Sequence, residues 1–206
     1  MNSAKNTPLQ NQQLAACQPA QRGRDEPLGA DVNKLHAEPN AEEISALVTR
    51  LEQDSAADLN RDEAFLQGVW ELRWSSSKQP WLKQAPWLDN LQILDVKNGR
   101  GCNLLKLRGP LGGLAGISVQ ADIARKEGNR VEVCFRRGGW VGPTLPGGQR
   151  LQLLREVKQS FPAWLDITVL DDTLRICRGN AGTVFCLLRR SDLNVADFFP
   201  QVANTI

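Results

Sequence analysis

The chain has 206 residues, 41% of them hydrophobic, which is enough for one domain with a buried core plus a tail. It has no apolar run of the roughly 18 residues that a membrane-spanning helix needs, so we expect any membrane association to be peripheral. The formal charge of +2 conceals an asymmetry: residues 1–63 hold 6 Lys and Arg against 11 Asp and Glu, and residues 64–206 hold 19 against 12.

The net charge is therefore −5 in the first part and +7 in the second. A basic body suits a surface that meets anionic headgroups, or one that its acidic leader partly masks. The alternative is an ordinary solvated exterior, which the dispersed positions of the positive charges favour. Lys and Arg do not form a stripe with aromatic residues, so we expect no nucleic-acid partner.

Metal and catalytic chemistry have few candidate residues. The cysteines are odd in number, widely spaced and without a CxxC motif, and His36 is the single histidine. We expect no metal, no cofactor and no nucleophile–base pair, hence no enzymatic activity. Cysteines inside strand-like segments are typical of buried apolar positions in a reducing compartment, so we expect a protein that is not secreted; they are Cys134, Cys177 and Cys186.

Residues 1–40 are rich in Gln, Asn, Pro and Ala and have no periodicity, which predicts a disordered leader. Within it, Leu14 to Cys17 is similar to a lipoprotein cleavage site but lacks the preceding apolar stretch. The leader also lacks the Arg and Ser content of an organelle transit peptide. Apolar residues at helical spacing follow in 41–51 and again in 61–67, so residues 41–67 are predicted as helices that pack on the next domain.

From Gly68 onward the hydrophobic period becomes two, which predicts β-strands. The predicted strands are 68–77, 91–96, 102–108, 117–123, 131–135, 151–157, 165–170, 174–178 and 183–190. Eight or nine short strands joined by tight turns predict a mainly β fold, an antiparallel barrel over residues 68–192 with a C-terminal tail at 193–206. A barrel of this size either is filled by side chains or holds one small ligand.

Several apolar residues are expected to point into the barrel, where they form either ordinary core or a ligand contact. They are Trp70, Leu72, Trp74, Val133, Phe135, Ile167 and Val169. The loop after the first strand carries Trp81, Leu82, Trp87 and Leu88, which suit a membrane interface or a plug over the barrel end. Near the C-terminus, Phe198 and Phe199 also suit either a membrane interface or a plug over the barrel end.

Two polar or glycine-rich features indicate turns. Asp171 and Asp172 lie between two predicted strands, and no catalytic partner accompanies them. Gly179 and Gly182 flank Asn180 in a predicted hairpin loop, where we expect both glycines to need a positive φ.

Two segments resemble the plastid lipid-associated protein (PAP)/fibrillin family. The first, residues 66–77, has the Gly-x-Trp of the family's first strand; the second, residues 165–189, has its Leu-Arg-Ile-x-Arg-Gly and Gly-x-x-Phe elements. The likeness spans roughly residues 41–190. Its motif positions here are Gly68, Trp70, Asp171, Leu174, Arg175, Arg178, Gly179, Gly182 and Phe185. The chain departs from the family at Trp74 and Val169, where Tyr is common, and it has no Tyr at all.

The resemblance implies a lipocalin-like barrel, in which one of Arg175 and Arg178 stacks on Trp70, a role favoured over binding a headgroup. It also implies a non-enzymatic protein of thylakoids or plastoglobules that binds or shields a carotenoid, prenylquinone or other lipid and helps under light stress. Its expected location is the cytoplasm or the cytoplasmic thylakoid face of a cyanobacterium, or the plastid in a eukaryote. The alternative is a filled barrel that docks onto a protein partner, either an enzyme of prenylquinone synthesis or a pigment–protein complex.

Overall fold

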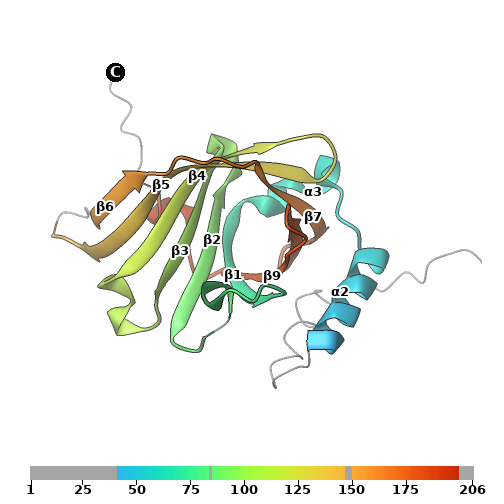
Figure 1. Ribbon diagram of the computed structural model, residues 1–206, viewed down its shortest axis with the longest axis horizontal. Helices are drawn as coiled ribbons and strands as arrows, with labels where there is room; N and C mark the ends of the chain where they lie inside the picture. Colours follow the sequence, from blue (N-terminus) through green and yellow to red (C-terminus); the bar gives the residue numbers. More distant parts are fainter. Residues whose placement is uncertain (1–40, 84, 147–149, 200–206) are drawn as a thin grey trace, which may run out of the picture.

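The computed structural model describes residues 41–83, 85–146 and 150–199, and its strands form one curved sheet with helices at its side and end (Figure 1). The mainly β class and the two N-terminal helices are as predicted. The helices are α2 (Ala41–Asp54) and α3 (Leu59–Leu66); the strands are β1 (Gly68–Ser75), β2 (Leu88–Asp95), β3 (Arg100–Leu107), β4 (Gly116–Arg125), β5 (Arg130–Thr144), β6 (Arg150–Glu156), β7 (Ala163–Leu170), β8 (Leu174–Gly179) and β9 (Val184–Arg189).

The strands close into an antiparallel barrel, which confirms the predicted fold. The sheet order among the described strands is β4-β3-β2-β1-β9-β8-β7-β5-β6, and an additional pairing of β4 with β5 closes eight strands into a ring. Strand β6 is the ninth and pairs with β5 outside that ring. Closure leaves the eight ring strands without unpaired edges along most of their length.

Strand β5 changes partner halfway. Residues 130–133 pair with β7, whereas residues 137–144 pair with β6. Between the two, the Gln159 side chain substitutes for a strand, since its Oε1 accepts from the Phe135 N–H at 2.6 Å and its Nε2 donates to the Val133 carbonyl at 3.2 Å. One amide side chain therefore satisfies backbone groups where neither neighbouring strand reaches.

The two helices cover different parts of the barrel (Figure 1). Helix α2 packs its apolar stripe of Ile44, Val48 and Leu51 on the outer face of β7, β8 and β9. Helix α3 closes one end, because Leu59 and Leu66 join the interior cluster around Trp70. Asp58 caps α3 by accepting from the Asn60 N–H at 3.0 Å.

The segment after β9 covers the outer face of β1, β2 and β3. Phe199 is buried there in a cluster that includes Val69 and Ile93, and a short turn at Val195–Asp197 precedes it. This places the Phe198–Phe199 pair in an outer core cluster. The predicted leader at 1–40 and residues 200–206 lie outside the described residues. None of the helices described is both long and apolar enough to span a bilayer.

Candidate ligand cavity

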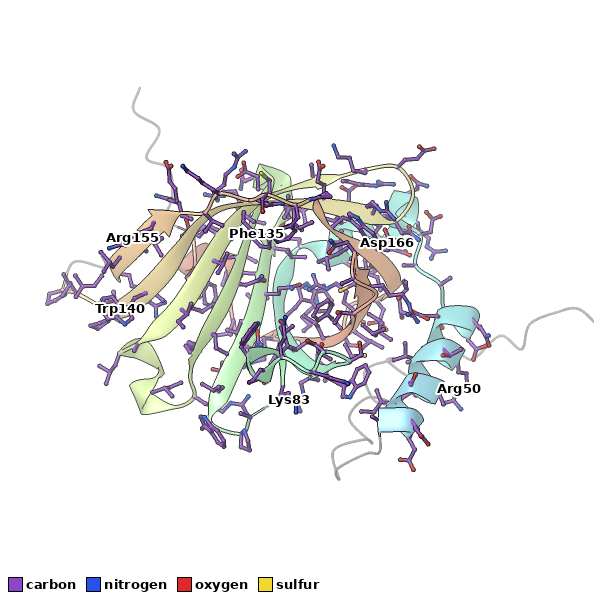
Figure 2. All side chains as sticks on the ribbon, viewed as in Figure 1. Arg50, Lys83, Phe135, Trp140, Arg155 and Asp166 are labelled. Atoms are coloured by element: carbon purple, nitrogen blue, oxygen red, sulfur yellow. The ribbon has the colours of Figure 1, made fainter. Side chains whose placement is uncertain are left out.

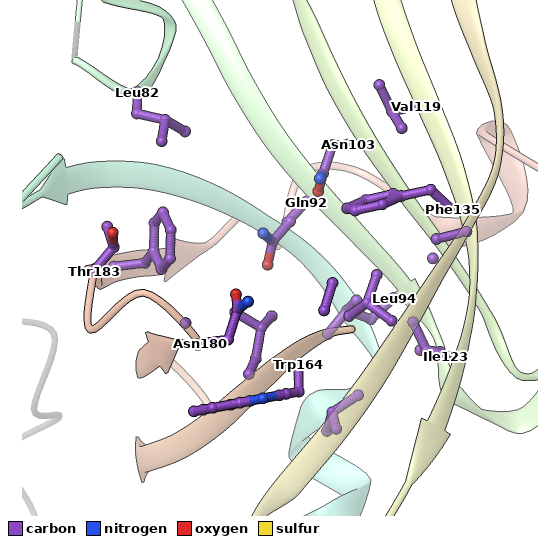
Figure 3. Close-up of a pocket in the computed structure, with 18 of the residues that line it drawn as sticks. Leu82, Gln92, Leu94, Asn103, Val119, Ile123, Phe135, Trp164, Asn180 and Thr183 are labelled. Carbon is purple, nitrogen blue, oxygen red and sulfur yellow. The ribbon is translucent and has the colours of Figure 1, made fainter. Parts of the chain in front are cut away.

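The barrel encloses an open cavity of about 470 Å³ (Figure 3). Its wall is mostly apolar, and Leu94, Phe135 and Trp164 reach it from three different strands. Two amide side chains, Gln92 and Asn103, extend into the same space. A mostly apolar wall with a few polar groups is typical of sites for small hydrophobic ligands.

A second cavity of about 520 Å³ continues from the first toward the end of the barrel opposite α3. The two share lining residues, namely Trp81, Leu82, Gln92, Asn103, Val119, Phe135 and Phe185. They are therefore two compartments of one space. Side chains fill the barrel interior only at the α3 end, and the rest contains this cavity.

An exposed apolar surface extends from this second compartment across four strands. Leu105 on β3 faces Ile117 on β4, Ile117 faces Trp140 on β5, and Trp140 faces Leu153 on β6. Directly opposed residues share a sheet face. We call these four the apolar row; Leu105 and Ile117 also line the cavity. Ile117, Trp140 and Leu153 are 58%, 41% and 65% exposed, and Figure 2 shows Trp140 farther along β5 than Phe135.

The predicted interior residues divide into three groups. Val133, Phe135 and Ile167 line the first compartment, and Leu72 lines the second. Trp70 is fully buried and belongs to the core cluster at the α3 end, where its Nε1 donates to the Leu66 carbonyl at 3.0 Å. Trp70 lines neither compartment.

Trp74 and Val169 require a correction, because both lie outside the barrel in the cluster beneath α2. The reason is a shift in strand register. A bulge or irregularity lies between Leu72 and Trp74 in β1, and another lies between Ile167 and Val169 in β7. An extra residue in a strand moves all later side chains to the opposite face, so simple alternation places these two residues wrongly.

The motif arginines have separate positions. The Arg175 guanidinium lies 5.0 Å from the Trp70 ring centroid, and Arg189, which the sequence argument did not consider, lies 4.3 Å from it. Arg178 instead binds Glu52 of α2 through Nε at 2.8 Å and Nη2 at 2.7 Å. Gly68 has a φ of +151°, and a Cβ there would collide with the Arg189 guanidinium.

The turn residues are partly as expected. Asp171 closes the β7–β8 turn by accepting from the Thr173 and Leu174 N–H groups at 2.7 and 2.6 Å, and Leu174 is buried beneath α2. Gly182 has a φ of +74°, but the expectation of a positive φ at Gly179 is wrong, because that residue ends β8 in ordinary backbone geometry. Gly179 faces Phe185, and both line the cavity.

The loop after β1 has apolar side chains that point both inward and outward. Leu82 packs against the interior cluster, whereas Trp81 and Trp87 are 57% and 65% exposed. Trp81 also lines both compartments, and the Asn90 side chain holds its carbonyl at 2.9 Å. Leu88 begins β2 opposite Leu107.

Sequence reasoning missed several cavity residues. Val119 and Ile123 could have been found, because they alternate with polar residues along 117–123. Gln92 and Asn103 gave no such signal, since a polar side chain at a strand position predicts an outward direction, and the resemblance marked Arg175 only as a candidate partner of Trp70. Here all three line the cavity.

Comparison with known proteins gives one result. The model of the PAP_fibrillin family matches residues 25–188, whereas no curated protein and no solved structure matches the chain. The matched range includes both helices, eight complete strands and nearly all of β9. This family consists of structural, lipid-associated proteins and is not known for enzymatic activity. The chain therefore belongs to the PAP/fibrillin family.

Proposed function

We propose that this protein is a non-enzymatic lipid-associated protein whose barrel takes up a hydrophobic molecule, such as a carotenoid, a prenylquinone or another lipid, at a membrane surface. The observation that carries the proposal is the open apolar cavity and its continuation into the apolar row. Membership of a lipid-associated family agrees with it. The filled-barrel scaffold is less well supported, because the compartments of about 470 and 520 Å³ leave the interior open.

The ligand part is tested by titrating the delipidated full-length protein with the neutral hydrophobic dye Nile red. We expect saturable blue-shifted emission that Val119→Trp abolishes, because Val119 lines both compartments and an indole there fills the space between them. Gln152→Trp is the matched control, since Gln152 is exposed and lines neither compartment. Equal dye binding by both variants would contradict uptake into the barrel.

The membrane part rests on the same end of the molecule. Trp81, Trp87 and the apolar row all lie at the barrel end opposite α3, and Arg155 follows Leu153 by two residues on the same strand face. Exposed aromatic and aliphatic side chains beside a cation suit an anionic bilayer surface. We therefore propose that this end contacts the membrane, at a thylakoid or a lipid body.

Flotation with vesicles of phosphatidylcholine and phosphatidylglycerol tests this contact. We expect the wild type to float and the double variant Trp81→Ala, Trp87→Ala to float less, with added salt weakening both. Phe65→Ala is the control, because Phe65 is exposed on α3 at the other end. A wild type that stays with the soluble fraction, or a double variant that floats equally well, would refute the contact.

A further inference from the structure

The interior of the barrel contains one charged side chain with unusual surroundings. Arg175 on β8 is fully buried and lines the first compartment. No other residue that lines either compartment, among those described, is charged. A cavity whose wall is otherwise apolar or amide-bearing and contains a single cation favours ligands that carry a negative charge.

The contacts of Arg175 leave much of its hydrogen-bonding capacity unused. Nη2 donates to Oε1 of Gln92, and the guanidinium lies over Trp70. Nε and Nη1 have no hydrogen-bond partner among the described residues. The electrostatic neighbours within this part of the chain are the Cys177 thiol and the like-charged Arg189, with no carboxylate among them.

The other buried charged side chains of the described residues have counter-ions. Each buried carboxylate of the described chain forms an ion pair with an arginine: Asp62 with Arg61, Glu71 with Arg108, Asp89 with Arg108, and Asp95 with Arg100. Among the residues that the structure describes, Arg175 is the one buried charged side chain without a counter-ion. Burial lowers its pKa to about 10, so the side chain is still protonated at neutral pH.

A buried, unpaired cation is costly, and a ligand that brings the missing charge removes that cost. We propose that Arg175, with Gln92 beside it, is the binding site for the carboxylate of a long-chain monocarboxylic acid whose hydrocarbon chain fills the two compartments. The inference rests on the proposed function, because it assigns a head group to the ligand of the same cavity. One guanidinium balances one negative charge, so a carboxylate fits better than a diphosphate, which would require further cations.

The direction of the ligand follows from the positions of the residues. Arg175 lies over Trp70, which packs with Leu59 and Leu66 at the end that α3 closes. From there the shared wall of Val119, Phe135 and Phe185 leads toward the apolar row. The acid group therefore lies deep in the barrel and the end of the chain lies toward the membrane-facing end.

The test compares oleic acid with oleyl alcohol, which have the same chain length and unsaturation but differ in charge. On the delipidated full-length protein we expect the acid to bind about tenfold more tightly than the alcohol. Arg175→Met removes that preference while the alcohol still binds, and Arg175→Lys restores part of it. Arg136→Met is the matched control and keeps the preference, because Arg136 is exposed and pairs with Asp122 on the barrel exterior.

The outcomes separate the two proposals. Equal binding of acid and alcohol by the wild type, or a preference that survives in Arg175→Met, overturns the carboxylate site and leaves the hydrophobic cavity standing. Binding of neither molecule overturns both proposals.

A second measurement needs no variant and therefore does not depend on the folding of Arg175→Met. The ¹³C resonance of carboxyl-labelled oleate bound to the wild type should remain that of the ionised form as the pH falls through the range in which the free acid protonates. The neighbouring guanidinium lowers the carboxyl pKa in this way. A bound carboxyl group that titrates as it does in water would overturn the site.

Discussion

At the scale of single residues, Trp70 contacts two guanidinium groups. Arg175 lies 5.0 Å and Arg189 lies 4.3 Å from the ring centroid, and Arg189 also donates to backbone carbonyls of Phe65, Gln67 and Asp172. Each contact between a cation and an aromatic face contributes on the order of 1 kcal/mol. Because Arg189 also binds the segment between α3 and β1, Trp70 helps to fix the closed end of the barrel.

Gly68 makes this arrangement possible, and its replacement is a sharp test. Gly68→Ala should lower the free energy of unfolding by more than about 1 kcal/mol, because alanine resists the positive φ and its Cβ collides with Arg189. Denaturant unfolding followed by tryptophan fluorescence measures the change. Gly113→Ala is the control, since Gly113 has open space around its Cα. Similar destabilisation by both substitutions would argue against the Arg189 contact.

At the scale of elements, the bulges in β1 and β7 limit how far the period-two pattern predicts which side chains point into the barrel. Up to Leu72 and Ile167 the period of two assigns the inner face correctly, and beyond each irregularity it assigns Trp74 and Val169 to the wrong face. The strands themselves were predictable because most carry apolar residues on at least one face. The sequence does not mark the positions of the two bulges, because neither directly follows a glycine or proline.

Helix α2 depends on the Arg178–Glu52 pair for part of its attachment. Burial by itself raises the Glu52 pKa, but hydrogen bonds from Arg178 and Thr168 outweigh it and lower the pKa below the ordinary 4.5. A depressed folded-state pKa means that the ion pair stabilises the fold above pH 4.5 and loses this contribution as the pH falls through the folded-state value.

Glu52→Gln should therefore lower the free energy of unfolding by about 1 kcal/mol near neutral pH, a modest value because Arg178 is partly exposed. The difference from the wild type should shrink toward zero as the pH falls below 4.5 and through the lowered folded-state pKa of Glu52. Urea unfolding at several pH values measures it, and Glu132→Gln is a control in a fully surface pair with Lys126. A difference that does not change with pH would contradict the ionic role of Glu52.

The change of partner along β5 depends on Gln159. Gln159→Leu should cost about 1–3 kcal/mol, because the Phe135 N–H and the Val133 carbonyl lose their side-chain partner. Gln152→Leu on β6 should change stability by no more than about 0.5 kcal/mol, since Gln152 is exposed. Hydrogen exchange at the Phe135 amide gives a local readout, and unchanged protection in Gln159→Leu would refute the bridge.

At the scale of the whole molecule, the two faces of the β1–β4 wall have different coverings. The segment ending at Phe199 packs on the outer face, whereas the inner face borders the cavity and the apolar row. Barrel closure was predictable from the number and spacing of strands, but the open interior was not. Whether a barrel is filled depends on the sizes of residues that meet from distant strands, such as Val119 and Phe185, and on polar residues such as Gln92 that point inward.

The central claim is that the interior of this barrel holds a hydrophobic ligand. Its most direct test is solvent extraction of the purified full-length protein, followed by mass spectrometry, with the Val119→Trp variant alongside. We predict about one equivalent of lipid per wild-type chain and almost none from the variant, because its indole occupies the junction of the two compartments. No lipid from the wild type, or the same amount from both proteins, would contradict the claim.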